Sequence, residues 1–221
     1  MSGAHESRSL LLPGPVGPLE GILWSPAGGA APALACVVCH PHPLFGGTMH
    51  NKVVYQAAKS LDSLGLAVLR FNFRGVGKSA GTHDAGDGEL GDVCSALDFL
   101  AAEFPAVPQL VAGFSFGSRV GLRVGCADDR VTQLIGLGIP VNRMDFSFLA
   151  RCTKPKLFVQ GGNDQFGAMD KAREVVASLP EPKRLVEVPD ADHFFAGKLD
   201  QLDTAIVAWV RERLSAANTA A

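Results

Sequence analysis

The sequence predicts an α/β protein whose central sheet is mainly parallel and is covered by helices on both faces. Two observations support this prediction. Short, continuous apolar runs, typical of strands buried on both faces, alternate with longer segments whose apolar residues recur at helical spacing. The chain also has 221 residues, of which 47% are hydrophobic and 19% are charged. This size and composition fit a single domain over residues 1–221 with a large buried core.

The elements alternate along the chain without a repeat or a low-complexity tract. Residues 1–27 are expected to form an antiparallel hairpin, because two apolar stretches flank a turn rich in Gly and Pro, and 28–33 form a linker. The other strands are expected at 33–39, 66–73, 109–114, 131–139, 156–161 and 184–189. The helices are expected at 53–64, 90–104, 116–126, 172–179 and 199–214. We therefore expect about eight strands, with ligands bound at the carboxyl ends of the parallel ones.

Charge and hydropathy exclude several classes of protein. A formal net charge of −2 argues against a surface for nucleic acid or for an anionic membrane. No apolar run reaches the roughly 18 residues of a membrane span, and the apolar stretch before Pro13 is too short for a secretory signal. The cysteines are odd in number and lie mostly in apolar segments, which is typical of free thiols in a reducing compartment. These features predict a cytoplasmic location.

A candidate nucleophile lies where the strand at 109–114 meets the following helix. The segment Gly113-Phe-Ser115-Phe-Gly117 has the pattern G-x-S-x-G. Such a turn holds its serine in a strained conformation above the sheet, and the glycines let the helix pass close to the strand. The helix N-terminus adds partial positive charge beside the hydroxyl. Ser115 is therefore predicted to be the nucleophile of a serine hydrolase, and the alternative is a helix start rich in Ser and Gly without chemistry.

Several segments together resemble one superfamily. HPHPLFGG, RFNFRGVGKS, GFSFGS and GGND, followed by ADHF, occur in an order that resembles the α/β-hydrolase superfamily. Within it, the chain is similar to small, lidless bacterial serine hydrolases related to dienelactone hydrolase, and the likeness covers nearly the whole chain. The resemblance implies the α/β-hydrolase fold and a triad of nucleophile, acid and histidine in that chain order. It implies no cofactor.

His193 is expected to be the base that activates Ser115. It lies in the loop after the strand at 184–189, where the resemblance places the base of the family. The other histidines are expected to have other roles: a mobile tail for His5, the surface for His50 and His83, and fixing of their own loop for His40 and His42, with substrate contact a further option for these last two.

A carboxylate is needed to orient the histidine and to stabilise its protonated form. Asp164 follows the strand at 156–161 in a glycine-rich turn that aims the side chain inward, and the resemblance places the acid after this strand. Asp145 is an alternative, because some members of the family carry the acid after the preceding strand. Asp190 and Asp192 lie beside the histidine and are interpreted as solvated loop residues.

Acyl transfer also needs two N–H donors for the developing oxyanion. The backbone N–H of Phe116, directly after the nucleophile, is expected to be one of them. The second is expected from the loop after the first buried strand, where Pro41 and Pro43 have no N–H. This leaves Leu44 or His42, and the match of HPLFG to the dienelactone-hydrolase pattern favours Leu44.

The site is expected to be open and mainly apolar. About fifteen residues connect the predicted strands between 140 and 155, enough for one short helix and not for a lid. The residues expected near the site are His42, Leu44, Phe45, Phe114, Phe116, Met144, Phe146, Phe148, Phe166 and Phe194. Two interpretations stay open for the phenylalanines: most of them belong to the core, or Phe146 and Phe148 line an acyl pocket. Because no basic cluster stands out for phosphate or carboxylate recognition, the sequence favours a small, fairly apolar ester or thioester.

Three other patterns are rejected, so no metal and no cofactor is expected. Cys36 and Cys39 precede a histidine as in haem-attachment and zinc motifs, but side chains three apart in a strand point to opposite faces. The Gly-Lys-Ser sequence ending at Ser79 hints at a phosphate loop, yet Asn72 stands where that motif needs glycine. The acidic run at 83–89 lacks the spacing of a calcium loop and is interpreted as solvated.

The main hypothesis is a carboxylesterase that forms an acyl-enzyme on Ser115, with activity that rises with pH as His193 loses its proton. A thioesterase, a peptidase or an acyltransferase would use the same triad. A binding module that kept the fold without chemistry is a third hypothesis, because a fold alone does not prove an activity. The expected partner is a small-molecule ester, and the oligomeric state is left open.

Overall fold

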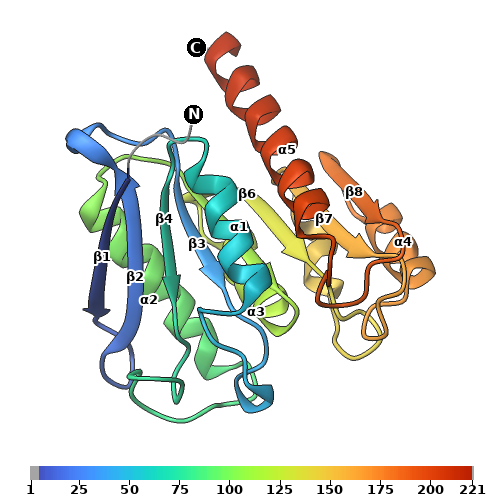
Figure 1. Ribbon diagram of the computed structural model, residues 1–221, viewed down its shortest axis with the longest axis horizontal. Helices are drawn as coiled ribbons and strands as arrows, with labels where there is room; N and C mark the ends of the chain where they lie inside the picture. The colour runs from blue at the N-terminus through green and yellow to red at the C-terminus, as the bar shows by residue number, and fades with distance from the viewer. Residues whose placement is uncertain (1–4, 221) are drawn as a thin grey trace.

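The computed structural model describes residues 5–220, with side chains up to residue 216. The described residues form one eight-stranded sheet in the order β1-β2-β4-β3-β5-β6-β7-β8 (Figure 1). The strands are β1 (His5–Leu12), β2 (Leu19–Pro26), β3 (Ala35–Cys39), β4 (Ala67–Phe71), β5 (Gln109–Phe114), β6 (Val131–Leu137), β7 (Lys156–Gly161) and β8 (Lys183–Val188). The β1–β2 and β2–β4 pairs are antiparallel, and the other neighbouring pairs are parallel. The mainly parallel sheet and the N-terminal hairpin predicted from the sequence are therefore confirmed.

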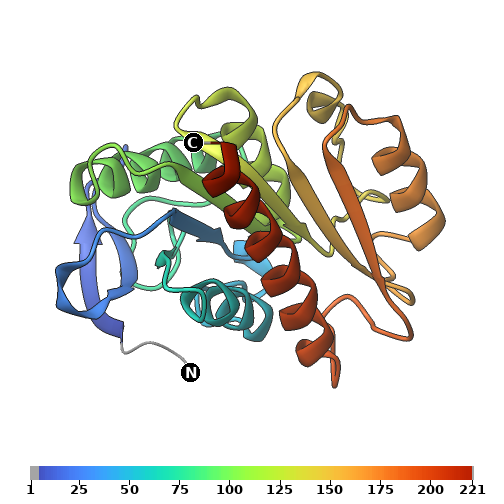
Figure 2. The ribbon, with the colours of Figure 1, turned by 90° about the horizontal axis from the view of Figure 1, so that it is seen from above.

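Helices cover both faces of this sheet. The α-helices of the described residues are α1 (Lys52–Asp62), α2 (Gly88–Glu103), α3 (Phe116–Ala127), α4 (Met169–Ser178) and α5 (Leu199–Ala220), and the short 3-10 helices are η1 (Ala27–Gly29), η2 (Pro43–Phe45) and η3 (Ser147–Arg151). Helices α1 and α5 lie on one face, and α2, α3 and α4 lie on the other (Figure 2). Helix α5 runs beyond the predicted end at Leu214, because the alanine-rich residues that follow favour a helix without any apolar periodicity.

Two hydrophobic clusters, one on each side of the sheet, hold the layers together. Within β3, Val37 and Cys39 belong to the cluster under α2 and α3, whereas Cys36 and Val38 belong to the cluster under α1 and α5. Both cysteines are fully buried, and burial raises the pKa of both thiols. The predicted opposite orientation of Cys36 and Cys39 follows from their place in a strand that is covered on both faces.

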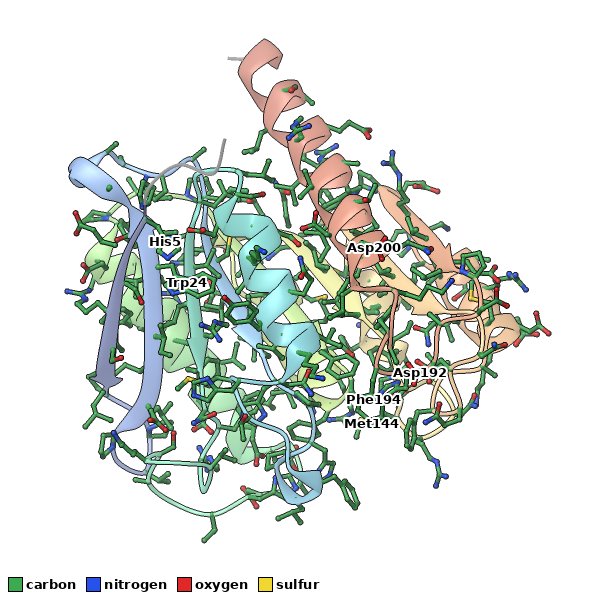
Figure 3. The ribbon with its side chains drawn as sticks, in the orientation of Figure 1. His5, Trp24, Met144, Asp192, Phe194 and Asp200 are labelled. Atoms are coloured by element: carbon green, nitrogen blue, oxygen red, sulfur yellow. The ribbon has the colours of Figure 1, made fainter. Side chains whose placement is uncertain are left out.

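His5 was expected in a mobile tail, but it is the first residue of β1. Its ring stacks on Trp24 with 5.1 Å between ring centroids, and its Nδ1 lies 2.9 Å from Oδ2 of Asp62 (Figure 3). No pattern in the sequence indicates this order, because β1 is an edge strand. Its first five residues face solvent and are mostly polar, so no apolar pattern marks them.

The carboxyl ends of the parallel strands meet at one edge of the sheet. The loops that project from this edge span residues 40–51, 72–87, 138–155, 162–168 and 189–198. The loop between β6 and β7 contains only η3, so no lid covers the edge. Both ends of the described chain, at His5 and at the end of α5, lie toward the opposite end of the sheet (Figures 1 and 3). None of the described helices combines the length and the apolar character needed to span a membrane.

Candidate active site

Ser115 lies on a sharp turn between β5 and α3. Its φ of 53° and ψ of −121° are strained values for a residue with a side chain. The N–H of Ser115 donates to the carbonyl of Leu137 at 3.0 Å, which holds the turn on the sheet. A Cβ at Gly113 would overlap the carbonyl of Gly117, and one at Gly117 would overlap that of His40. Both glycines are therefore required for α3 to start this close to the strands.

Two loops bring His193 and Asp164 to this turn. The Oγ of Ser115 lies 2.9 Å from Nε2 of His193, and Nδ1 of His193 lies 2.7 Å from Oδ2 of Asp164. His193 is 3% exposed and Asp164 is 4% exposed, so water competes little for these hydrogen bonds. With its proton on Nδ1, the imidazole donates to the carboxylate and accepts from the hydroxyl. The three side chains chosen from the sequence thus form one hydrogen-bonded series.

Three further hydrogen bonds hold Asp164. Its Oδ1 accepts from the N–H groups of Phe166 and Gly167 at 2.8 and 3.0 Å, and its Oδ2 accepts from Nε2 of Gln160 at 2.9 Å. Gln160 is fully buried, and its Oε1 accepts from the N–H of Ile139 at 2.9 Å. The position of the acid therefore depends on Gln160. This residue was not predicted, although a polar residue near the end of an otherwise apolar strand is a usable signal.

The other carboxylates considered for the acid have different partners. Asp145 accepts hydrogen bonds from the hydroxyl and the N–H of Ser147, and these hydrogen bonds lower its pKa. Asp192 accepts from backbone N–H groups two and four residues further along its own loop. Asp190 is exposed. Within the described part of the chain, none of the three is hydrogen-bonded to His193.

Three phenylalanine rings surround the imidazole of His193. The ring centroids of Phe114, Phe166 and Phe194 lie 5.0, 4.7 and 5.2 Å from that of the imidazole. Phe114 is fully buried, whereas Phe194 is 49% exposed and lies with Met144 at the carboxyl edge (Figure 3). These rings restrict the imidazole to the orientation that reaches both the hydroxyl and the carboxylate.

An open cavity of about 570 Å³ lies in front of Ser115. Its lining consists of Pro41, His42, Phe45, Gly46, Gly47, Asn51, Ser115, Phe116, Pro140, Arg143, Met144, Phe166, His193 and Phe194. The predicted pocket residues Phe114, Phe146 and Phe148 are absent from this lining. Phe114 packs against the imidazole from within the core, and Phe146 and Phe148 pack into the cluster beside α3. The expectation that these two residues line the pocket in front of Ser115 is therefore wrong, because Phe146 is buried in the core and Phe148 lines a different cavity.

The two alternatives for the second oxyanion donor differ in geometry. The N–H of Leu44 donates to Nδ1 of His42 at 3.3 Å, and Leu44 is 71% exposed. The N–H of His42 has no acceptor among the described residues, and His42 lines the cavity together with Ser115 and Phe116. Phe116 is the first residue of α3, so its N–H has no acceptor within the helix. The geometry therefore favours His42 over Leu44.

His40 fixes the start of this loop. It is fully buried, its Nδ1–H donates to the carbonyl of Pro41 at 2.6 Å, and its Nε2 accepts from the N–H of Phe73 at 3.0 Å. Burial lowers the pKa of His40 to about 4, so the ring is neutral near pH 7. A neutral ring is what these two hydrogen bonds require, because one nitrogen donates and the other accepts.

The ring of His42 packs between His83 and Phe116, with centroids 4.8 and 5.0 Å away. His83 was expected at the surface, but its Nδ1 lies 2.6 Å from Oε1 of the fully buried Glu89. Although burial opposes the effect, hydrogen bonds from backbone N–H groups of its own loop lower the pKa of Glu89. The interpretation of the acidic run at 83–89 as solvated is therefore wrong for Glu89, whereas Asp84 and Asp87 are exposed.

Comparison with known proteins identifies the family. A family model described as an alpha/beta hydrolase domain matches residues 38–212. The chain belongs to the α/β-hydrolase family. This α/β-hydrolase is 39% identical to the uncharacterized protein RP471 of Rickettsia prowazekii over 202 residues, which cover 87% of this chain and 84% of that protein.

Solved structures support the same assignment. XC6422 of Xanthomonas campestris, described as a serine hydrolase without lid, is 40% identical with a TM-score of 0.86 over 94% of each chain. A serine hydrolase homologue from Coxiella burnetii is 39% identical with a TM-score of 0.85 over 91% of this chain and 96% of that one. A dienelactone hydrolase from Anabaena variabilis, 19% identical, shares the fold with a TM-score of 0.78 over 94% of this chain and 98% of that one. The resemblance and the lidless α/β-hydrolase fold predicted from the sequence are confirmed.

Proposed function

We propose that this α/β-hydrolase is a carboxylesterase that works through an acyl-enzyme on Ser115. The observation that carries the proposal is the pair of hydrogen bonds, 2.9 and 2.7 Å long, that join Ser115, His193 and Asp164. This arrangement supplies a nucleophile, a base within reach of its proton, and a carboxylate that stabilises the resulting imidazolium. The further hydrogen bonds to Asp164 support a fixed orientation of the carboxylate during turnover.

The proposed reaction has two halves. In the first, Nε2 of His193 takes the proton of Ser115 while Oγ forms a bond to the ester carbonyl carbon, and the N–H groups of Phe116 and His42 donate to the oxyanion. The imidazolium then gives its proton to the leaving alkoxide as the C–O bond breaks. In the second half, a water molecule deprotonated by His193 attacks the acyl carbon. Ser115 leaves with that proton, and the carboxylic acid is released.

The cavity favours an ester with a small, apolar acyl group. Phe45, Met144, Phe166 and Phe194 give it an apolar wall. Because no lid excludes water, hydrolysis is favoured over transfer to a second alcohol. Thioesters and amides would meet the same groups, so a panel of butyryl esters, thioesters and amides ranks these alternatives by kcat/KM.

The proposed setting is the cytoplasm, with a small-molecule ester as partner. The five cysteines are free thiols, which supports a reducing compartment. The net charge of −2 gives no support to a surface for nucleic acid or for an anionic membrane.

The proposal is tested by labelling with a fluorophosphonate, which forms a covalent bond to an activated serine. Labelling is expected to be stoichiometric in the wild type and absent in Ser115→Ala. Hydrolysis of p-nitrophenyl butyrate by this variant is expected to fall by on the order of 10⁴-fold or more. Ser178→Ala, which removes an exposed hydroxyl on α4, is the matched control and keeps both signals. Full labelling and activity in Ser115→Ala would refute the proposal.

A further inference from the structure

A second, strongly basic cavity lies beside the active site. It has a volume of about 590 Å³, and its lining includes Arg119, Arg123 and Arg151 together with a single carboxylate, that of Asp145. Arg119 and Arg123 reach it from successive turns of α3, and Arg151 reaches it from the end of η3. Arg151 is distant in the sequence from the other two arginines, so the sequence alone shows no cluster of three.

The protein itself neutralises these guanidinium groups poorly. In the part of the chain that the structure describes, Arg119 and Arg151 form no ion pair, and Arg123 has only a 3.8 Å contact with the exposed carboxylate of Asp87. Asp145 lies near Arg119, but its oxygens accept hydrogen bonds within their own turn. Two like charges four residues apart on α3 also repel each other. An anion bound between the arginines would remove this repulsion.

The basic cavity is close to Ser115. Phe116 lines the active-site cavity and Arg119 lines the basic one, and these residues lie three apart on α3, about 4.5 Å along the helix axis. On the other wall, Met144 lines the active-site cavity and the next residue, Asp145, lines the basic one. The linings of the two cavities therefore adjoin along α3 and at 144–145, so an anionic group joined by a linker to an ester at Ser115 is expected to reach the arginines.

We propose that the basic cavity binds a phosphate group of the substrate, so that the enzyme hydrolyses esters whose alcohol half is phosphorylated. Guanidinium groups bind phosphate oxygens through paired N–H donors. The lining carries three positive charges and one negative charge, and a phosphate monoester at neutral pH carries about two negative charges. The apolar acyl group then lies in the first cavity and the phosphate lies in the second. This inference rests on the proposed esterase function and names the substrate class for the same site.

The test compares 4-(butyryloxy)butyl phosphate with the neutral 4-hydroxybutyl butyrate by measuring butyrate release. The wild type is expected to hydrolyse the phosphorylated ester with a kcat/KM at least tenfold higher, mainly through a lower KM, and added salt reduces this advantage. The variant Arg119→Gln/Arg151→Gln loses the advantage but hydrolyses the neutral ester as the wild type does. The control variant Arg173→Gln/Arg184→Gln removes the same charge from α4 and β8 and keeps the advantage.

Two results overturn the inference. One is an equal kcat/KM for both esters in the wild type, and the other is an equal loss of the preference for the phosphorylated ester in both double variants. Hydrolysis of neither ester contradicts the proposed esterase function instead. The phosphate site is then judged by equilibrium dialysis with inorganic pyrophosphate. The site is supported if the wild type binds pyrophosphate with a Kd below about 1 mM. This Kd must also rise at least tenfold in Arg119→Gln/Arg151→Gln and stay unchanged in the control variant. Absence of such binding overturns it.

Discussion

His40 links the stability of the protein to pH. Its buried ring makes two hydrogen bonds to the backbone, and burial lowers its pKa to about 4, whereas the imidazole of an unfolded chain has a pKa of about 6.5. Between these values the unfolded chain binds more protons than the folded one. The contribution of this histidine to stability is therefore complete above about pH 6.5 and is lost as the pH falls toward 4.

We predict that His40→Gln removes this pH dependence. A glutamine can accept from the N–H of Phe73 and donate to the carbonyl of Pro41 without titrating. Between pH 7 and pH 4, the free energy of unfolding of the wild type is expected to fall by about 3 kcal/mol more than that of the variant, as measured by urea unfolding. If the free energy of unfolding falls equally with pH in the two proteins, another group is responsible for the pH dependence.

Local sequence signals were enough to locate some site residues and not others. Ser115, Asp164 and His193 each follow a parallel strand predicted from the sequence, so the topology of the sheet brings them to one edge. The choice between His42 and Leu44 depends on how a short 3-10 helix turns each N–H, which no spacing in the sequence encodes.

The start of α3 shows how one element positions the chemistry. In Gly117→Ala, the new Cβ overlaps the carbonyl of His40, so the helix must move away from β3. We predict that this variant loses about 2–3 kcal/mol of unfolding free energy, the usual cost of overpacking, as measured by urea unfolding. Its kcat for p-nitrophenyl butyrate is also expected to fall, because Ser115 moves with the helix.

A glycine one turn further along α3 is the matched control. A Cβ at Gly121 would meet only the side chains of Val111 and Cys39, at 3.0 and 3.1 Å, and side chains can adjust. Gly121→Ala is therefore expected to cost less stability and to keep kcat unchanged. Equal losses in the two variants would contradict the role assigned to the backbone contact.

At the level of elements, the sequence analysis succeeded where both faces of an element are buried. Strands β5 and β7 have the predicted bounds, because their apolar runs end where burial ends. It missed the ordered, solvent-facing start of β1 at His5 and the burial of Glu89, whose carboxylate is held by backbone N–H groups of its own loop. A charged residue such as Glu89 looks solvated until its tertiary neighbours are known.

The missing lid determines how the whole molecule meets a substrate. Only η3 occupies the connection between β6 and β7, so no segment there has to open before an ester reaches Ser115. We predict that the initial rate of tributyrin hydrolysis rises hyperbolically with concentration and shows no jump at the solubility limit. A sharp increase in rate at the appearance of droplets would instead indicate a segment that moves at an interface.

The placement of the two chain ends also has a practical consequence. Both ends of the described chain lie toward one end of the sheet, whereas the loops that carry the reacting groups lie at the other (Figure 1). Attachment to a resin, an electrode or a fusion partner through either end therefore leaves the reactive face turned to the medium. A tag at either the N-terminal or the C-terminal end can therefore immobilise the protein without shielding the serine hydroxyl.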